Sequence, residues 1–331
     1  MKNSLVIMIC LIILASLALL SLCIGRYPVS GLDLLYYFFT SRDYDANLPV
    51  VLYNIRLPRI IGAVAVGGAL SISGAAYQGM FRNPMVSPDI LGVTSGAGFG
   101  AALAILLSLP IAGIQVLSFL GGITAVLVAV SISRSFGKSH EVILILVLSG
   151  IIISSLFSAM LSMMKYMADT DDKLPAITYW LMGSLSSIRM DELKVILPIL
   201  FAGIIPLIMV SWRINVLSFG EEEARTIGVN TSVMRAVLIA CASLTTACTI
   251  SISGMIGWVG LVVPHLSRLA VGPDHKILLP ASFLFGGIFL LIVDNLARSL
   301  SSVEIPIGIL TSVIGAPFFI WFLKKSTKKS W

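Results

Sequence analysis

Charged residues are scarce in this sequence. Asp, Glu, Lys and Arg make up 11% of the 331 residues, whereas 57% are hydrophobic and the mean hydropathy is +1.01. A soluble domain carries about a quarter charged residues. Apolar runs of about 20 residues, long enough to cross a bilayer core as a helix, recur along the whole chain. The sequence therefore predicts an all-α integral membrane protein and excludes a soluble one. Because no polar stretch is long enough for a second domain, residues 1–331 are predicted to form a single transmembrane domain.

Cysteine and histidine are also rare, at four and three residues. The cysteines lie in apolar segments without a C-x-x-C pair, as buried small hydrophobic residues do. The histidines are too scattered for a metal cluster, and no H-E-x-x-H motif is present. A search for a nucleophile paired with a base also finds nothing. We therefore expect no metal site and no catalytic residues, which disfavours an intramembrane enzyme.

A phosphate-binding loop is absent too. Gly137-Lys138-Ser139 looks like the end of G-x-x-x-x-G-K-[ST], but Ile132 stands where the first glycine would have to be and no strand precedes it. The glycines at 96–100 occur in a hydrophobic segment, which favours close helix packing over nucleotide binding. We expect the chain itself to bind no cofactor.

Hydropathy and turn residues predict about ten membrane spans. The first is not interpreted as a signal peptide, because it is too long and no A-x-A-like cleavage site follows it. The predicted spans are 4–25, 57–80, 93–109, 114–133, 141–164, 193–211, 232–253, 256–271, 278–298 and 306–323.

An even number of spans places both termini on one side, and the positive charges predict which side. With the termini in the cytoplasm, thirteen basic residues face inward and nine outward. The inward group includes the tail residues Lys324, Lys325, Lys328 and Lys329. A nucleic-acid partner is disfavoured, because the remaining basic residues are scattered. We expect a multi-pass protein of a bacterial-type cytoplasmic membrane.

A short repeat suggests an internal symmetry. Ser71-Ile72-Ser73-Gly74 in the second span recurs as Ser251-Ile252-Ser253-Gly254 in the seventh. Spans five apart run in opposite directions, so the pattern predicts an inverted repeat that relates spans 2–5 to spans 7–10. Chance similarity between common membrane residues accounts for four positions equally well.

The predicted spans offer a path for a solute, but they contain no evident group that would couple transport to an ion gradient. An ion-coupled secondary transporter usually places charged side chains near the bilayer midplane. Here Asp294 is the clearest charged residue within a span, and an i,i+4 pair with Arg298 explains it. We therefore expect the driving force to come from outside the chain and keep the secondary transporter as the alternative.

Several motifs resemble one family of permeases. They are RLPR at 56–59, GMFRNPMVSPDILGV at 79–93, GEEEARTIGV at 220–229, GLVVPH at 260–265, EIPIG at 304–308 and GAP at 315–317. Together they resemble the FecCD-type permeases of type II ABC importers for iron–siderophores, haem and cobalamin, over about residues 5–325.

The resemblance implies a ten-helix subunit that works as a dimer with a second copy or a paralogue. It also implies two cytoplasmic ATPases that use ATP and magnesium, and an external binding protein, periplasmic or lipid-anchored, that delivers the solute. Ferric siderophore is the substrate we expect, with haem or cobalamin as alternatives in the same family.

The acidic cluster in SFGEEEARTIGVN gains an interpretation from this resemblance. Three acids favour a helix N-terminus, Ala224 and Ile227 would form an apolar face, and Gly228 would end the helix. The resemblance implies that this stretch is the coupling helix that docks on the ATPase, whereas a solvated loop is the alternative. The predicted docking residues are Gly220, Glu221, Glu222, Glu223, Ala224, Arg225, Thr226, Ile227, Gly228 and Val229.

Two further sites follow from the family. Arg56, Arg59 and Arg298 are expected at the outer face, where they would receive acidic residues of the binding protein; snorkelling toward lipid phosphates is the alternative. Asn83, Ser139 and His140 are expected at the cytoplasmic gate. For Asn83, capping of a helix before Pro84 is the alternative.

Overall fold

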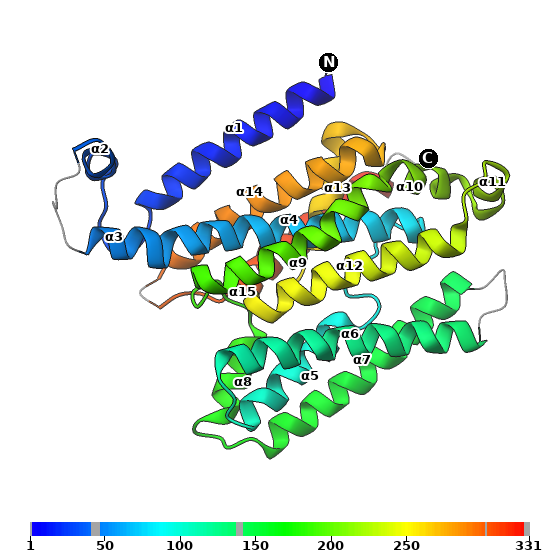
Figure 1. Cartoon of the computed structure of the whole chain (residues 1–331), viewed down its shortest axis with the longest axis horizontal. Helices are drawn as coiled ribbons and strands as arrows, with labels where there is room; N and C mark the ends of the chain where they lie inside the picture. Colours follow the sequence, from blue (N-terminus) through cyan, green and yellow to red (C-terminus); the bar gives the residue numbers. More distant parts are fainter. Residues whose placement is uncertain (1, 41–46, 137–141, 302, 328–331) are drawn as a thin grey trace.

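Helices build nearly all of the protein that the computed structural model describes, which comprises residues 2–40, 47–136, 142–301 and 303–327 (Figure 1). Their bounds are α1 Lys2–Cys23, α2 Gly31–Thr40, α3 Leu48–Val50, the π-helical turn η1 Val51–Arg56, α4 Leu57–Phe81, α5 Val93–Leu106, α6 Ile111–Phe136, α7 Val142–Met167, α8 Lys173–Leu181, α9 Met190–Met209, α10 Ser211–Phe219, α11 Glu221–Thr226, α12 Thr231–Ser253, α13 Val259–Val271, α14 His275–Ser299 and α15 Ile307–Thr327.

The all-helical membrane architecture predicted from hydropathy is confirmed. Within the described ranges, seven helical segments are long and apolar enough to cross a membrane, and three shorter apolar helices lie at Val93–Leu106, Val259–Val271 and Ile307–Ile320. Each predicted span coincides with one of these segments. Because the three shorter helices do not meet the length of a full span, the count of ten stays a prediction.

The second span begins earlier than the sequence indicated. Leu48–Phe81 is one helical segment of 34 residues, in which α3 continues through η1 into α4. At about 1.5 Å per residue it is about 50 Å long, well beyond a hydrocarbon core of about 30 Å. Arg56 and Arg59 therefore lie inside a continuous helix, whereas the predicted span 57–80 would have placed them at its start.

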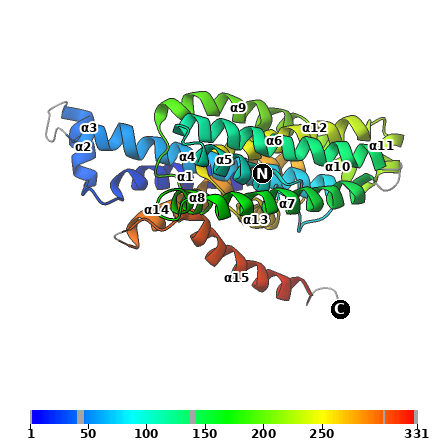
Figure 2. The same ribbon diagram turned by 90° about the horizontal axis from the view of Figure 1, so that it is seen from below.

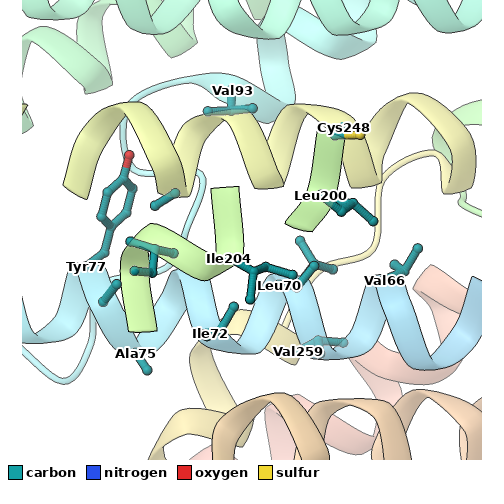
Figure 3. Close-up of a cluster of buried hydrophobic side chains, with 14 of the residues drawn as sticks. Val66, Leu70, Ile72, Ala75, Tyr77, Val93, Leu200, Ile204, Cys248 and Val259 are labelled. Carbon is teal, nitrogen blue, oxygen red and sulfur yellow. The ribbon is translucent and has the colours of Figure 1, made fainter. Parts of the chain in front are cut away.

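Helix α4 lies at the centre of the bundle, and every residue from Ala65 to Phe81 is buried. Its side chains pack with those of α5, α9, α12 and α13, as Figure 3 shows for Leu70, Leu200 and Val259. Small residues allow neighbouring backbones to come close. A Cβ atom at Gly67 would lie 2.2 Å from the carbonyl oxygen of Gly286 on α14, and one at Gly74 would lie 1.8 Å from that of Gly260 on α13.

A second group of helices, α5 to α8, lies beside this central group (Figure 1). Helices α5 and α6 approach each other closely, since a Cβ atom at Gly96 would lie 2.4 Å from the carbonyl oxygen of Gly121. Helix α15 projects away from the rest of the bundle (Figure 2). Helix α11 lies at one tip of the molecule, far from α2 and α3 at the opposite tip.

The helix lengths agree with the predicted inverted repeat without establishing it. Helices α4, α5, α6 and α7 have 25, 14, 26 and 26 residues, and α12, α13, α14 and α15 have 23, 13, 25 and 21. The shortest helix takes the second place in both groups. The repeat stays a prediction.

Candidate functional site

The acidic stretch folds into a helix, α11, whose first turn depends on a glycine. Gly220 precedes α11 with φ of 144°. The Glu223 carboxylate folds back over it, so that a Cβ atom at position 220 would lie 1.9 Å from Glu223 Oε2. This places a negative charge at the positive end of the helix dipole, which stabilises the helix start.

The C-terminus of α11 is closed by a Schellman motif. The backbone N–H of Val229 donates to the Ala224 carbonyl at 2.9 Å, and the N–H of Gly228 donates to that of Arg225 at 3.0 Å. Gly228 has φ of +85°, a conformation in which glycine is strongly preferred. The prediction that Gly228 ends the helix is confirmed.

Ala224 and Ile227, which were expected to form one apolar face of α11, point in different directions. Ala224 is fully buried and Val229 nearly so, so these two residues attach the helix to the bundle. Ile227, in contrast, is 57% exposed, and Phe219 at the end of α10 is 75% exposed. Together with the exposed Glu222, Glu223 and Arg225 they form an apolar and charged surface at the tip of the molecule, which we call the α11 surface.

A hydrogen-bonded link that the sequence did not reveal connects α10 to the start of α14. The Asn215 Oδ1 atom accepts from the backbone N–H of His275 at 2.8 Å and lies 2.7 Å from His275 Nδ1. The Asn215 side-chain amide donates to Asp274 Oδ1 at 2.6 Å. The only sequence signal was a lone amide between the apolar Ile214 and Val216. The link ties the segment that carries α11 to a long membrane helix.

At the opposite tip, an ion-pair network joins two of the three arginines predicted to receive the binding protein. Arg59 Nε lies 2.7 Å from Asp294 Oδ1, and Arg59 Nη1 lies 2.9 Å from the Glu304 carboxylate. Arg298 Nε lies 3.4 Å from Asp294 Oδ2, which confirms the predicted i,i+4 pair. Two arginines and two acids thus neutralise each other.

The three arginines expected at the outer face are buried, contrary to their expected exposure. Arg56, Arg59 and Arg298 expose 2%, 5% and 5% of their surface. Arg56 donates to the carbonyl oxygens of Leu22 and Tyr27, and Arg298 donates to that of Ser21 at 3.1 Å. Burying a guanidinium is costly unless its N–H groups are paired, which explains these contacts. Contact with a binding protein stays a prediction, and it would require these side chains to leave partners in their own chain.

A cavity of about 350 Å³ lies where two non-helical segments of the bundle meet. It is lined by Leu70, Ser87, Pro88, Asp89, Thr94, Thr246, Ile250, Met255, Ile256, Gly257, Trp258, Gly260 and Leu261. The segments around Ser87–Asp89 and Met255–Trp258 each precede one of the two shortest membrane helices, α5 and α13. Irregular backbone at membrane depth is tolerated where it is enclosed by protein or lines a water-filled cavity, as in many transporter pathways.

Trp258 connects this cavity to the outlying helix α15. Its φ of +70° is unusual for a bulky residue. A Cβ atom at Gly315 would lie 2.7 Å from the Trp258 Cβ atom, and the rings of Trp258 and Phe319 are 6.3 Å apart. A displacement of α15 would therefore move its contacts with Trp258, which lines the cavity.

The predicted gate residues are only partly described. The Asn83 Oδ1 atom accepts from the backbone N–H of Met85 at 2.9 Å, which forms an Asx-turn. Asn83 therefore does not cap the start of a helix at Pro84, because the next helix, α5, begins only at Val93. Ser139 and His140 lie outside the described residues. The gate itself stays a prediction.

A family model matches the amino-acid sequence almost from end to end. The model of the FecCD transport family matches residues 11–325. The chain belongs to the FecCD transport family. The resemblance inferred from the motifs is thereby confirmed.

Relatives share both sequence and fold. The molybdate import system permease protein MolB of Haemophilus influenzae is 43% identical over 93% of this chain and 92% of that protein. A probable iron chelatin transport system permease protein of Helicobacter pylori is 40% identical over 86% of each. Other relatives are named for cobalamin and haemin transport. A solved structure described as an inward-facing conformation of an ABC transporter, assigned to the metal-chelate type, has a TM-score of 0.86 and 39% identity over 98% of this chain and 99% of that one.

Proposed function

We propose that this FecCD permease is the translocation subunit of an ATP-driven importer for a ferric siderophore. Membership of the family and the apolar helices support an ABC importer permease in the inner membrane. The observation that carries the coupling proposal is the α11 surface, where exposed Phe219 and Ile227 stand among charged residues at the tip of the bundle. Exposed apolar groups rimmed by charges are typical of protein interfaces.

In this mechanism the chain moves a solute and makes or breaks no bond. A loaded binding protein docks at the outer tip, near Arg59 and Arg298, and releases its solute toward the interface of a permease dimer. ATP binding draws two ATPase subunits together, and α11 transmits their motion. The Asn215 link carries this motion from α10 to α14. The transition is a two-state change biased by the partners and the nucleotide.

The orientation follows from the same proposal. The α11 surface faces the cytoplasm, where ATP is available, and both termini lie on that side. The acidic α11 then contacts a basic or apolar cleft of the ATPase, and complementary charges speed the encounter of such partners.

An oxyanion is a second candidate substrate. The relative MolB is named for molybdate import. In addition, a cavity of about 510 Å³ near the outer ends of α5 and α12 is lined by five serines and a lysine: Ser108, Ser184, Ser186, Ser187, Ser253 and Lys173. Hydroxyl groups and an ammonium group are suitable donors to a tetrahedral oxyanion.

The substrate proposal is tested by uptake in cells that lack this gene, with and without a plasmid copy. The panel comprises iron on several siderophores, haem, cobalamin and molybdate, each with its binding protein present. Gene-dependent uptake of a ferric siderophore supports the proposal, and gene-dependent uptake of molybdate alone favours the oxyanion. Uptake that continues after ATP depletion and stops with an uncoupler would instead indicate an ion-coupled transporter.

The coupling proposal is tested by replacing Glu221, Glu222 and Glu223 together with lysine. We expect uptake to fall by more than tenfold, because the lysines would meet like charges in a basic cleft or bury unpaired charges in an apolar one. ATPase activity of the assembled complex should lose its stimulation by the loaded binding protein. The matched control is Asp191→Lys and Glu192→Lys, a pair of acids at the start of α9. Normal uptake in the triple variant would refute the coupling role.

A further inference from the structure

A groove of about 770 Å³ lies at the tip of the molecule that carries α11. Its walls are the end of α4, helix α10 and the end of α13, together with the non-helical connections that follow α4 and α13. Phe219, which is 75% exposed and belongs to the α11 surface, lines the groove as well. The groove therefore continues the surface to which the coupling proposal assigns the ATPase.

Two arginines give this groove a positive charge. Arg82 is exposed at the C-terminus of α4, and Arg268 is half-buried in the last turn of α13. Among the described residues neither has an acidic side chain within 4 Å, and Arg268 donates to the neutral Oε1 atom of Gln78 at 3.3 Å. The lining residues are all described, and the only acid among them, Asp274, already accepts from the Asn215 amide. A half-buried guanidinium with a neutral partner gains from contact with a carboxylate.

Gln78 connects the groove to the cavity of about 350 Å³. Its side chain is 2% exposed. While it accepts from Arg268, its amide donates to the Leu261 carbonyl at 3.2 Å and to the Val86 carbonyl at 3.4 Å. Leu261 lines that cavity, and Val86 directly precedes its lining segment at 87–89. A group that pairs with Arg268 therefore acts through one buried side chain on two parts of the cavity wall.

We propose that the groove receives an acidic side chain, Asp or Glu, of the ATPase subunit, which pairs with Arg268 and, at the rim, with Arg82. This inference rests on the proposed function, because it requires the ATPase to dock at the α11 surface. The planar fork of a guanidinium matches the two oxygens of a carboxylate. An acidic α11 beside a basic groove requires the opposite pattern of charge in the partner, which fixes its orientation.

The backbone around the groove favours a protein over lipid. Residues 82–84 and 272–274, which contribute to its walls, are not helical. Irregular backbone does not face the hydrocarbon of a bilayer, because its polar groups would lack partners there. This face therefore meets water or protein. The exposed Phe219 at its edge favours a protein over a free anion, since apolar groups rimmed by charges are typical of protein interfaces.

The first test replaces Arg268 with lysine in the assembled transporter, a change that keeps the positive charge and supplies an amine. A water-soluble carbodiimide joins an amine to a carboxylate in direct contact through an amide bond. We expect a crosslink from the introduced lysine to an Asp or Glu of the ATPase, located by mass spectrometry. The matched control is Arg213→Lys, at an exposed position of α10 at the same tip that does not line the groove, and it should give no such crosslink.

The second test measures the affinity of the ATPase for the full chain in nanodiscs of phosphatidylcholine. Arg268→Gln should weaken binding by about tenfold, because it removes one partner of a charge pair. Arg213→Gln should stay within about twofold of the unchanged chain. Added phosphatidylglycerol should leave the ratio between the two variants unchanged, whereas a ratio that falls to one would assign Arg268 to lipid and overturn the proposal.

A photo-crosslinker at Ile227 separates failure of this inference from failure of the proposed function. If position 227 captures the ATPase while the lysine introduced for Arg268 crosslinks only to Asp274 or to nothing, the groove is not a docking site and the proposed function stands. Equal affinities for Arg268→Gln and Arg213→Gln would overturn the inference in the same way. Capture of the ATPase from neither position would contradict both.

Discussion

Asp294 is the residue on which the ion-pair network with Arg59 and Arg298 depends, because it pairs with both arginines while its own side chain is fully buried. Asp294→Ala leaves two buried guanidinium groups short of a counter-charge. Breaking a buried pair in this way costs about 3–5 kcal/mol. We therefore expect a clear fall in the midpoint of thermal unfolding in detergent.

The control for this variant is Asp191→Ala. Asp191 pairs with Lys194 at 3.4 Å, but its carboxylate is 93% exposed. Exposed pairs contribute about 0–1 kcal/mol, so the midpoint should hardly change. Equal midpoints for Asp294→Ala and Asp191→Ala would show that the network does not stabilise the fold.

Asp274 makes the stability of the folded chain depend on pH in the acid range. Its pKa is lowered from the usual value of 3.8, first by the hydrogen bond from the Asn215 side chain and then by the bond from the backbone N–H of Lys276. The ionised carboxylate therefore stabilises the folded chain above the unfolded pKa, and this contribution is lost as the pH falls through the lower folded pKa.

This dependence is measured from the unfolding midpoint between about pH 6 and pH 3, a range that brackets the usual carboxyl pKa. The near-isosteric variant Asp274→Asn can still accept both hydrogen bonds but cannot ionise. We expect the midpoint of the unchanged chain to fall more steeply with acid than that of the variant. Parallel curves would contradict the assigned cause.

The residue scale also shows where sequence reasoning reaches its limit. The pair between Asp294 and Arg298 was predictable, because residues four apart meet on one helix face. The pair between Arg59 and Glu304 was not, because these residues are 245 positions apart in the chain. Exposed and buried arginines look alike in a sequence, so Arg56, Arg59 and Arg298 were expected on the surface.

At the scale of helices, close contacts between glycines hold the central group together. Gly74→Ala would place a methyl group 1.8 Å from the Gly260 carbonyl oxygen, so α4 and α13 must move apart. Overpacking of this kind costs about 1–3 kcal/mol. We expect a lower unfolding midpoint and weaker transport, because the displaced helices border the cavity of about 350 Å³.

Gly257→Ala is the matched control for this change. Gly257 lines the same cavity, but a Cβ atom there would meet nothing within 4 Å. The unfolding midpoint of this variant should stay unchanged. If both alanine variants unfold at the same temperature, the close approach of α4 and α13 is not a source of stability.

Most helix bounds could be predicted from the sequence, and the reason is physical. Long apolar runs have to be helical in lipid, so hydropathy located α12 and α14 within a few residues. The extension of α4 back to Leu48 and the helix α8 were missed, because mixed polarity outside the membrane gives no such constraint. The meeting of the segments at 87–89 and 255–258 depends on tertiary packing that no local pattern encodes.

On the scale of the whole molecule, the two tips have different chemistry. One carries a self-neutralising network of buried charges, and the other carries the exposed α11 surface. The cavity of about 350 Å³ lies between them, and Trp258 in its wall contacts the outlying helix α15. This arrangement suits a subunit that receives solute at one end and a mechanical input at the other.

In the proposed function, α11 is the contact through which an ATPase drives the permease. The most direct measurement places a photo-crosslinking amino acid at Ile227, which is 57% exposed, in the assembled transporter in membranes. The control position is Val195, which is 66% exposed on the apolar helix α9. We predict that position 227 captures the ATPase subunit, identified by mass spectrometry, and that position 195 does not. Capture of no ATPase from position 227 in an actively transporting complex would contradict the account.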